Sequence, residues 1–195
     1  VAPRDIERTA QALLAGGVCC IEVTFSHNTP DAAGATIEML KRLTCAFGQD
    51  VLLGAGTVLT EQEVEWAADA GARYIISPDL NEQVIAKTKM LGMISIPGAL
   101  TPTEIVRAHA LGADFVKVFP AGTLGPAYLK AVRGPIAHIP LLAVGGVRED
   151  NMRALLDAGV CGFGIGSELV SQVLVQEGAF EEITRRARAF VAQCQ

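Results

Sequence analysis

A lysine lies in the middle of an apolar β-strand pattern in the segment ADFVKVFP, residues 113–120. Because a strand sends alternate side chains to opposite faces, Phe115, Lys117 and Phe119 share one face. Apolar surroundings disfavour a charged ammonium, which leaves a nucleophilic amine able to form Schiff bases with carbonyl compounds. On this strand alone, a lysine that reaches water or pairs with a carboxylate is the more ordinary interpretation.

A carboxylate stands in a second strand pattern, VCCIEVT at residues 18–24. Alternation places Glu22 on one face with Cys20 and Thr24, while the intervening apolar side chains take the other face. A carboxylate in such a strand loses hydration on burial, as the lysine does. Each of these two charged residues therefore needs a partner or a chemical use.

The elements that must position these residues alternate regularly along the chain. Short β-rich runs lie near 18–24, 51–57, 73–77, 93–97, 114–119, 140–144 and 161–165. Helical patterns lie near 4–16, 30–46, 61–71, 81–91, 102–111, 149–158 and 178–193. This alternation is typical of βα units around a parallel sheet, and the nearly continuous apolar strands indicate that both faces are covered. Thr60 is the expected N-cap of the helix at 61–71.

Seven strand-helix units preceded by a helix predict an α/β fold, a (β/α)8 TIM barrel whose first strand is missing from this sequence. One domain spans residues 1–195, since no linker or low-complexity tract divides the chain. A barrel without its first strand would leave two unpaired edges, so we expect the protein to extend upstream of Val1. An open doubly wound sheet is the alternative architecture.

Two glycine-rich turns indicate which strand is missing. Gly145 and Gly146 follow the strand at 140–144, and Gly166 and Ser167 follow the last strand, ahead of a short helical stretch, ELVSQVL. In (β/α)8 barrels a phosphate group commonly binds at the loops after strands seven and eight, against a helix N-terminus. The last two strands are therefore expected to be the seventh and eighth, and the missing one the first.

This numbering places the two charged residues opposite one another. The strand of Glu22 becomes the second and the strand of Lys117 the sixth, so the two side chains extend from opposite walls of a narrow interior. An amine and a carboxylate that face one cavity provide a Schiff-base nucleophile and a proton carrier. A buried ion pair without chemistry is the alternative interpretation.

Composition excludes several other classes of function. The net charge of −5 and the lack of a Lys/Arg cluster argue against a nucleic-acid partner or an anionic membrane surface, and no apolar run is long enough to span a bilayer. Five cysteines without a CxxC motif and no signal peptide indicate a cytoplasmic protein, and most of the cysteines lie in apolar segments, where a free cysteine packs as a small apolar side chain. Three widely spaced histidines predict no metal site. A small-molecule partner is expected.

The segment GAGTVL at residues 54–59 resembles the start of a dinucleotide-binding fingerprint, with Asp79 as a candidate ribose acid. Leu59 stands where the third glycine belongs, and the segment lies in the middle of the chain, which argues against a nicotinamide site. Thr57, at the end of its strand, carries a hydroxyl that could bind a substrate or merely cap the strand.

The motifs IEVTF, GAGTVLT, ISP, PGALTPTE, VKVFPA, GGV and GIGSEL occur in an order that resembles the 2-keto-3-deoxy-6-phosphogluconate (KDPG) and 4-hydroxy-2-oxoglutarate (KHG) aldolase family. The resemblance covers nearly the whole chain. It implies a homotrimeric (β/α)8 class I aldolase that needs no metal or other cofactor.

The same resemblance implies roles for individual residues. Lys117 matches the residue that forms the Schiff base with pyruvate, and Glu22 matches the acid/base residue. The candidate substrate-binding residues are Thr57, Phe119, Gly145, Gly146, Gly166, Ser167 and Ser26, of which Gly145, Gly146 and Ser167 match the phosphate pocket.

Two positions depart from the pattern of the family. Ser26 stands where the family often has an arginine that holds the pyruvate carboxylate, and Val144 stands where it often has threonine. Candidates to replace the arginine are the Ser26 hydroxyl, His27, backbone N–H groups around Asn28, and an arginine on the missing first strand. These departures affect the expected substrate more than the expected chemistry.

The expected reaction is therefore cleavage of a 2-keto-3-deoxy-6-phospho sugar acid to pyruvate and glyceraldehyde 3-phosphate, with KHG as a further candidate substrate. A phosphosugar isomerase or epimerase on the same barrel, or a phosphosugar-binding protein without catalysis, are the alternatives.

Overall fold

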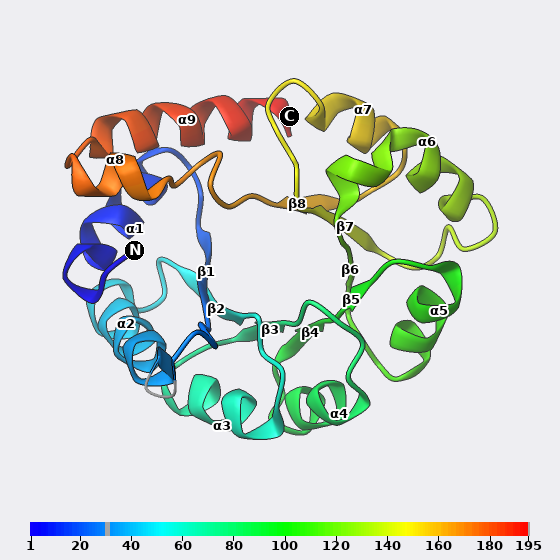
Figure 1. The fold of residues 1–195 in the computed structure, drawn as a ribbon, viewed down its shortest axis with the longest axis horizontal. Helices are drawn as coiled ribbons and strands as arrows, with labels where there is room; N and C mark the ends of the chain where they lie inside the picture. Colours follow the sequence, from blue (N-terminus) through cyan, green and yellow to red (C-terminus); the bar gives the residue numbers. More distant parts are fainter. Residues whose placement is uncertain (30–31, 195) are drawn as a thin grey trace.

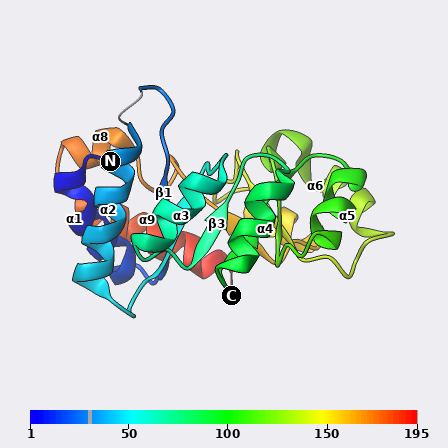
Figure 2. The same cartoon turned by 90° about the horizontal axis from the view of Figure 1, so that it is seen from below.

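A computed structural model of the chain describes residues 1–29 and 32–194. The strands lie in the middle of the molecule and the helices lie outside them (Figure 1). Seen from the edge, α1, α2, α8 and α9 gather at one end of the molecule, and α5 and α6 at the other (Figure 2).

The seven strands expected from the sequence are confirmed, and the one expected at 93–97 is divided into β4 and β5. The strands are β1 (Cys20–Thr24), β2 (Leu52–Gly56), β3 (Tyr74–Ile76), β4 (Ile94–Ile96), β5 (Gly98–Ala99), β6 (Val116–Val118), β7 (Leu141–Val144) and β8 (Gly162–Gly164). The helices are α1 (Ile6–Ala15), α2 (Ala32–Phe47), α3 (Glu61–Asp69), α4 (Glu82–Met90), α5 (Pro102–Ala110), α6 (Ala121–Arg133), α7 (Met152–Asp157), α8 (Gln172–Gln176) and α9 (Phe180–Gln193), with a 3₁₀ turn at Pro3–Asp5. The helix expected at 30–46 corresponds to α2, and its first two positions lie outside the described residues.

All strand pairs are parallel and form two four-stranded sheets, β1-β2-β3-β4 and β5-β6-β7-β8. The two sheets meet at Pro97, where the strand expected at 93–97 continues as β5 beyond its predicted end. Proline has no N–H to donate to a ladder, so the pairing changes partner there. The Pro97 carbonyl still accepts a hydrogen bond from the Lys117 N–H at 2.9 Å.

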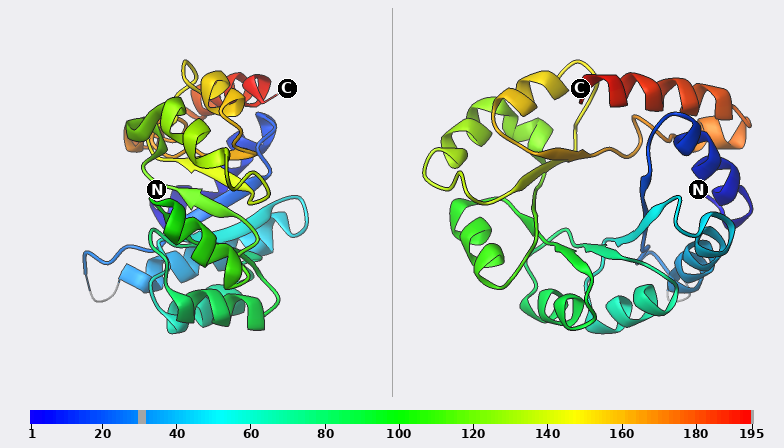
Figure 3. Two further views of the ribbon diagram at one scale, coloured as in Figure 1. Left: turned by 90° about the vertical axis from the view of Figure 1, so that its right-hand side faces the viewer. Right: turned by 180° about the vertical axis from the view of Figure 1, so that it is seen from behind.

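The outer edges of the two sheets, β1 and β8, lie apart, and α9 crosses the gap between them (Figure 3). No backbone ladder joins these two strands within residues 1–29 and 32–194. The expected α/β fold with parallel strands is confirmed, and the ring is open at this edge. We call this open edge the seam.

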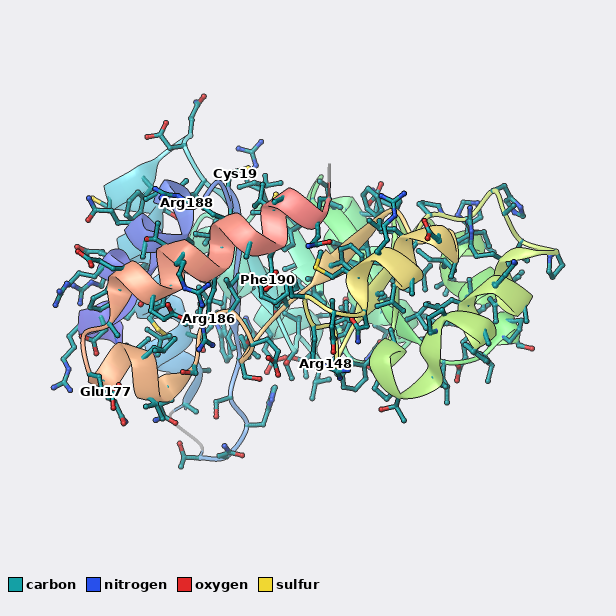
Figure 4. The ribbon with its side chains drawn as sticks, turned by 90° about the horizontal axis from the view of Figure 1, so that it is seen from above. Cys19, Arg148, Glu177, Arg186, Arg188 and Phe190 are labelled. Carbon is teal, nitrogen blue, oxygen red and sulfur yellow. The ribbon has the colours of Figure 1, made fainter. Side chains whose placement is uncertain are left out.

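Helices close the molecule at the seam. The Thr184 hydroxyl on α9 donates to the Ala12 carbonyl on α1 at 2.9 Å, and a Cβ on Gly16 would lie 2.3 Å from the Ala187 side chain. Figure 4 looks onto α9, where Arg186, Arg188 and Phe190 are labelled. Arg188 donates to the Ala15 carbonyl, and Phe190 is buried. Glycine at position 16 thus allows the two helices to approach closely.

Helix α6 is an element that the sequence analysis missed. Pro120, Gly122, Gly125 and Pro126 make its sequence look like a loop. Gly125 is not helical, with φ of 76°, and separates two helical pieces. Pro126 follows directly, and proline is tolerated in the first turn of a helix because an N–H there has no partner in the helix.

The N-cap expected at Thr60 is confirmed and belongs to a full capping box. The Thr60 hydroxyl accepts from the Glu63 N–H, while the Glu63 carboxylate accepts from the Leu59 and Thr60 N–H groups at 2.7 and 3.1 Å. Glu63 is itself buried. Such reciprocal bonds fix the start of a helix, so the loop between β2 and α3 is held rigidly.

Candidate active site

Lys117 lies in the middle of β6 and is 8% exposed. Its backbone pairs with Gly98 of β5 and Leu142 of β7, so it belongs to the interior of the second sheet. The Nζ atom lies 4.8 Å from the centroid of the Phe119 ring. Phe115 is half-buried and packs in the same interior. The structure thus shows Phe119 against the lysine, whereas Phe115 packs in the apolar cluster of Tyr74, Ile76 and Ile96.

Glu22 extends from β1, on the other side of the interior. The expected alternation is confirmed, since Ile21, Val23 and Phe25 are buried against the helices. The prediction that Glu22 is buried was wrong, because solvent enters the interior beside the seam and leaves the inner face of β1 exposed.

The Glu22 carboxylate has a defined place above a glycine of the neighbouring strand. Its Oε1 atom accepts from the Thr24 hydroxyl at 3.2 Å. A Cβ on Gly56 would lie only 1.3 Å from the same oxygen. Any larger residue at position 56 would therefore push the carboxylate out of this place.

Lys117 and Glu22 influence one another across the interior. Burial lowers the pKa of the Lys117 ammonium, and the negative charge of Glu22 offsets part of that change. Solvent reaches Glu22, yet the many protein atoms around it remove part of its hydration. This loss of hydration raises the pKa of Glu22, whereas the charge of Lys117 and the hydrogen bond from Thr24 lower it. The pair thus combines an amine that loses its proton more easily than usual with a carboxyl that keeps its proton more readily.

Gly54 has a similar role beneath Glu22. The Tyr74 ring covers this glycine so closely that a Cβ there would lie 2.1 Å from the ring. In GAGTVL, Gly54 and Gly56 lie inside β2 and make room for Tyr74 and Glu22. Their place in a strand, rather than in a turn before a helix, argues against the dinucleotide-binding alternative.

Thr57 follows β2 at the carboxyl end of the strands and has a backbone φ of 53°. A threonine in the left-handed region is strained because its Cβ is branched. Such strain is found preferentially at functional sites, so the geometry favours a substrate contact over a simple strand cap.

Ser26 and His27 lie in the loop after β1. The Ser26 hydroxyl accepts from the Asn28 N–H at 3.5 Å, and the His27 Nε2 atom lies 2.7 Å from Oε1 of the buried Glu63. His27 is therefore engaged with the capping box of α3. Of the candidates to replace the missing arginine, Ser26 and the Asn28 backbone keep more freedom to meet a ligand than His27 does.

Gly145 and Gly146 form a sharp turn after β7, with φ values of 83° and 71°. A Cβ on Gly145 would lie 2.8 Å from the Phe119 ring, and the Gly145 carbonyl accepts from the Gly122 N–H at 2.8 Å. The structure thus brings this turn against Phe119, which in turn contacts Lys117.

Gly166 and Ser167 lie in the connection between β8 and α8. The Gly166 carbonyl accepts from the Leu169 and Val170 N–H groups, both at 2.9 Å, and a Cβ on Gly166 would meet nothing within 4 Å. The helix expected over ELVSQVL begins later, at Gln172, and has only five residues. Any anion site here therefore depends on the turn after Gly166, and no hydrogen bond joins that turn to Lys117 in the described part of the chain.

Three further expectations concern metal ligands, membrane-spanning helices and the cysteines. Within residues 1–29 and 32–194, no three His, Cys, Asp or Glu side chains gather in a way that could hold a metal ion. Across the same ranges, no helix is both long and apolar enough to cross a membrane. All five cysteines are free and exposed, so the prediction that they are packed as small apolar residues was wrong. Cys19 and Cys20 lie beside the seam, where an edge strand has no neighbour to cover them.

Sequence reasoning missed two contacts near the predicted site residues. Tyr74 looked like an ordinary strand residue, and its position over Gly54 follows from the register between strands, which a sequence does not specify. The bond between His27 and Glu63 joins two loops that are 36 residues apart. The capping pattern Thr60-x-x-Glu63 could have indicated that the Glu63 carboxylate caps the helix, but it does not indicate that His27 binds the same carboxylate.

Comparisons with known proteins agree with this geometry. The family model described as KDPG and KHG aldolase matches residues 2–186. A probable 2-dehydro-3-deoxy-6-phosphogalactonate aldolase of Rhizobium meliloti is 39% identical over 86% of this chain and 76% of the relative. A solved structure described as native KDPGal matches with a TM-score of 0.88 and 30% identity over 99% of this chain and 89% of the other. The KDPG aldolase of Legionella pneumophila, solved with pyruvate as a covalent carbinolamine, matches with a TM-score of 0.84 and 29% identity over 96% of this chain and 88% of the other.

Proposed function

Because the chain belongs to the KDPG and KHG aldolase family, we propose that it cleaves a 2-keto-3-deoxy-6-phospho sugar acid to pyruvate and glyceraldehyde 3-phosphate. The observation that carries the proposal is the shared interior of Lys117 and Glu22, an amine whose pKa is lowered by burial facing a carboxyl whose pKa is raised by desolvation. The relatives are aldolases, so the isomerase and non-catalytic alternatives gain no support.

Lys117 is the proposed nucleophile. Its neutral amine attacks the C2 carbonyl of the substrate, and loss of water from the carbinolamine gives a protonated imine. The imine nitrogen accepts the electron pair of the C3–C4 bond as that bond breaks, which leaves an enamine of pyruvate and releases the aldehyde. The Legionella relative, captured with pyruvate as a carbinolamine, supports this first step.

Glu22 is the proposed proton carrier. As a carboxylate it takes the proton of the C4 hydroxyl when C3–C4 breaks, and as an acid it returns a proton to C3 of the enamine. Water then hydrolyses the imine and frees Lys117 with pyruvate. A carboxyl with a raised pKa suits both roles, because it gains a proton more readily than an ordinary glutamate and can return that proton in the later step.

The substrate phosphate is proposed to bind at the turns after β7 and β8. Gly145 and Gly146 have the positive φ values that expose backbone N–H groups in a turn, and the free space above Gly166 leaves room for a ligand. Ser167 supplies a hydroxyl there. Phe119 lies between this end of the site and Lys117 and would pack against the carbon chain.

The pyruvate end of the substrate is proposed to meet Thr57 and the loop of Ser26. Without an arginine at position 26, the carboxylate would be held by the Ser26 hydroxyl and the backbone N–H groups near Asn28. Relatives named for the galactonate substrate, together with this departure, support including the 6-phosphogalactonate form beside the 6-phosphogluconate form.

The architecture of the whole barrel is part of the same proposal. The parallel strands, with β4 and β5 counted as one, support a (β/α)8 barrel that is open at the seam between β1 and β8. We further propose a homotrimer located in the cytoplasm, as the family resemblance implied. One domain would span residues 1–195.

Covalent trapping tests the proposed chemistry. Incubation with pyruvate and borohydride should attach one reduced pyruvyl group, and peptide mapping should locate it on Lys117. Lys117→Arg should abolish both the adduct and the cleavage of either phosphorylated sugar acid, whereas Lys130→Arg, on the exposed side of α6, should retain both. An active protein that yields no adduct would exclude the Schiff-base mechanism.

A further inference from the structure

Tyr74 lies directly below the proposed catalytic pair, in a cluster of apolar side chains that forms the floor of the interior. It is 6% exposed, and its neighbours in the cluster are aliphatic or phenyl side chains: Ile76, Ile94, Ile96, Phe115 and Leu142. A phenylalanine would fill such a floor equally well. No buried side-chain oxygen in the described residues lacks a hydrogen-bond partner, and the Tyr74 hydroxyl makes no hydrogen bond to the protein, so this hydroxyl keeps contact with the solvent of the interior and is free to meet a polar group there.

The strand register directs that hydroxyl toward the strand of Glu22. Glu22 pairs with Gly54, and Gly54 pairs with Tyr74, so the three residues form one row across β1, β2 and β3. Gly54 has no side chain, and the outer carbon atoms of the Tyr74 ring cover it. The ring therefore points along the row, away from β4 and toward β1.

The electrostatic environment agrees with this direction. Burial raises the pKa of Tyr74, and the negative charge of Glu22 raises it further, followed by a smaller effect of Cys20. The phenol thus keeps its proton throughout the working range of an enzyme. A neutral hydroxyl beside a carboxylate is a permanent hydrogen-bond donor.

We propose that Tyr74 is a positioning residue for the aldol cleavage, whose hydroxyl interacts with the Glu22 carboxylate from below and favours its ionised form. Thr24 donates to the same carboxylate from the rim side, at 3.2 Å. Glu22 would then lie between two hydroxyl groups, with Lys117 across the interior. The proposal rests on the proposed function, because it explains how the proton carrier of that reaction is adjusted.

The direction of the effect follows from simple linkage. The charged and polar groups that act on Glu22 are Lys117 on β6 and Thr24 on its own strand, Glu22 and Cys20 both act on Tyr74 on β3, and β2 contributes glycines. A donor near the charged form lowers the pKa of a carboxyl, so removing the Tyr74 hydroxyl should raise the pKa of Glu22 further. As the pH falls, Glu22 of the variant is then protonated at a higher pH than Glu22 of the unchanged protein. Activity that depends on the ionised carboxylate is therefore lost at a higher pH as well.

Titration of Glu22 by NMR, with carbon-13 in the glutamate carboxyl groups, tests the proposal without relying on turnover. Comparison with Glu22→Gln assigns the signal. In Tyr74→Phe the Glu22 midpoint should move upward by about 0.5–1 pH unit, and the acid limb of kcat/KM should move with it. The matched control is Tyr128→Phe, because Tyr128, the other tyrosine of the chain, donates to the Leu100 carbonyl on the outside of the ring.

The outcomes separate this proposal from the proposed function. An unchanged Glu22 midpoint in Tyr74→Phe would overturn the role of Tyr74, as would an activity loss that is equal at every pH. A shifted midpoint in a protein that fails the pyruvate trapping would support the interaction and refute the aldolase chemistry. An equal shift in Tyr128→Phe would show a general effect and overturn the specific one.

Discussion

The two sheets of the ring differ in what they present to the interior. The sheet β1-β2-β3-β4 presents groups that bind or exchange protons, Glu22 and Tyr74, and the strained Thr57 follows at its rim. The sheet β5-β6-β7-β8 presents Lys117 among aromatic and aliphatic side chains, and continues into glycine turns.

This difference assigns separate tasks to the two sheets. In the proposed mechanism, imine formation needs the amine of the second sheet, whereas bond cleavage and reprotonation also need the carboxyl of the first. A change in the first sheet should therefore impair turnover while leaving imine formation intact. A change in the turns of the second sheet should impair recognition of the phosphorylated substrate.

The largest effect should come from removing the proton carrier of the first sheet. Glu22→Gln keeps the shape of the side chain, so we expect turnover to fall by about 10²–10⁴-fold while pyruvate is still trapped on Lys117. Steady-state kinetics measures turnover, and borohydride trapping measures imine formation, so the two are followed separately. Glu38→Gln, on the outside of α2, is the control and should change neither turnover nor trapping. Near-normal turnover in Glu22→Gln would make Glu22 a structural residue.

Displacing the same carboxylate without deleting it should have the next largest effect. In Gly56→Ala the new methyl group would lie 1.3 Å from Glu22 Oε1, and the flexible end of the side chain must move. A displacement of this size should lower kcat by about 10–100-fold with little loss of stability. Gly34→Ala on α2 is the control, because its Cβ meets nothing within 4 Å. Equal kinetics in the two variants would contradict the proposed place of the carboxylate.

A change in the second sheet should be weaker and selective. Ser167→Ala removes one hydroxyl from the proposed phosphate site, so KM for the phosphorylated sugar acids should rise about 3–10-fold. The concentration of pyruvate needed for trapping on Lys117 should stay the same, because pyruvate has no phosphate. A matching loss of pyruvate affinity would place Ser167 near the carboxylate end instead.

The smallest effect should come from a charge cluster outside both sheets. Side-chain hydrogen bonds from Arg185 and then Arg186 lower the pKa of Glu182 on α9 to about 2. A carboxyl with a depressed pKa stabilises the fold above its unfolded pKa, and this contribution is lost as the pH falls toward 2. Glu182→Gln should therefore lower the melting temperature slightly near pH 7, by an amount that shrinks on acidification, and leave turnover unchanged. A difference that grows in acid would reverse the assigned sign.

The strands, and the faces on which the proposed catalytic pair lies, could be predicted because they depend on local patterns. Alternation fixed the inward direction of Glu22 and Lys117, and the order of the strands placed them on opposite walls. Helix α6 was missed because Gly125 and Pro126 resemble loop residues, although the proline begins a second helical piece after the kink.

Properties that depend on contacts between distant segments could not be read from the chain. The position of Tyr74 over Gly54 depends on register, and the bond from His27 to Glu63 depends on two loops that meet only in the folded ring. The exposure of Glu22 likewise follows from the open seam rather than from its strand. A sequence pattern gives the face of a side chain, whereas burial depends on what covers that face.

The packing of α9 on α1 has a consequence for how the chain folds while it is being synthesised on the ribosome. Thr184 and Ala12, which join these helices, are 172 residues apart, whereas each parallel pair inside a sheet links segments that leave the ribosome one after the other. Contacts across so long a loop form late because closing the loop costs entropy. The face of α1 that receives α9 therefore stays uncovered until α9 has been synthesised.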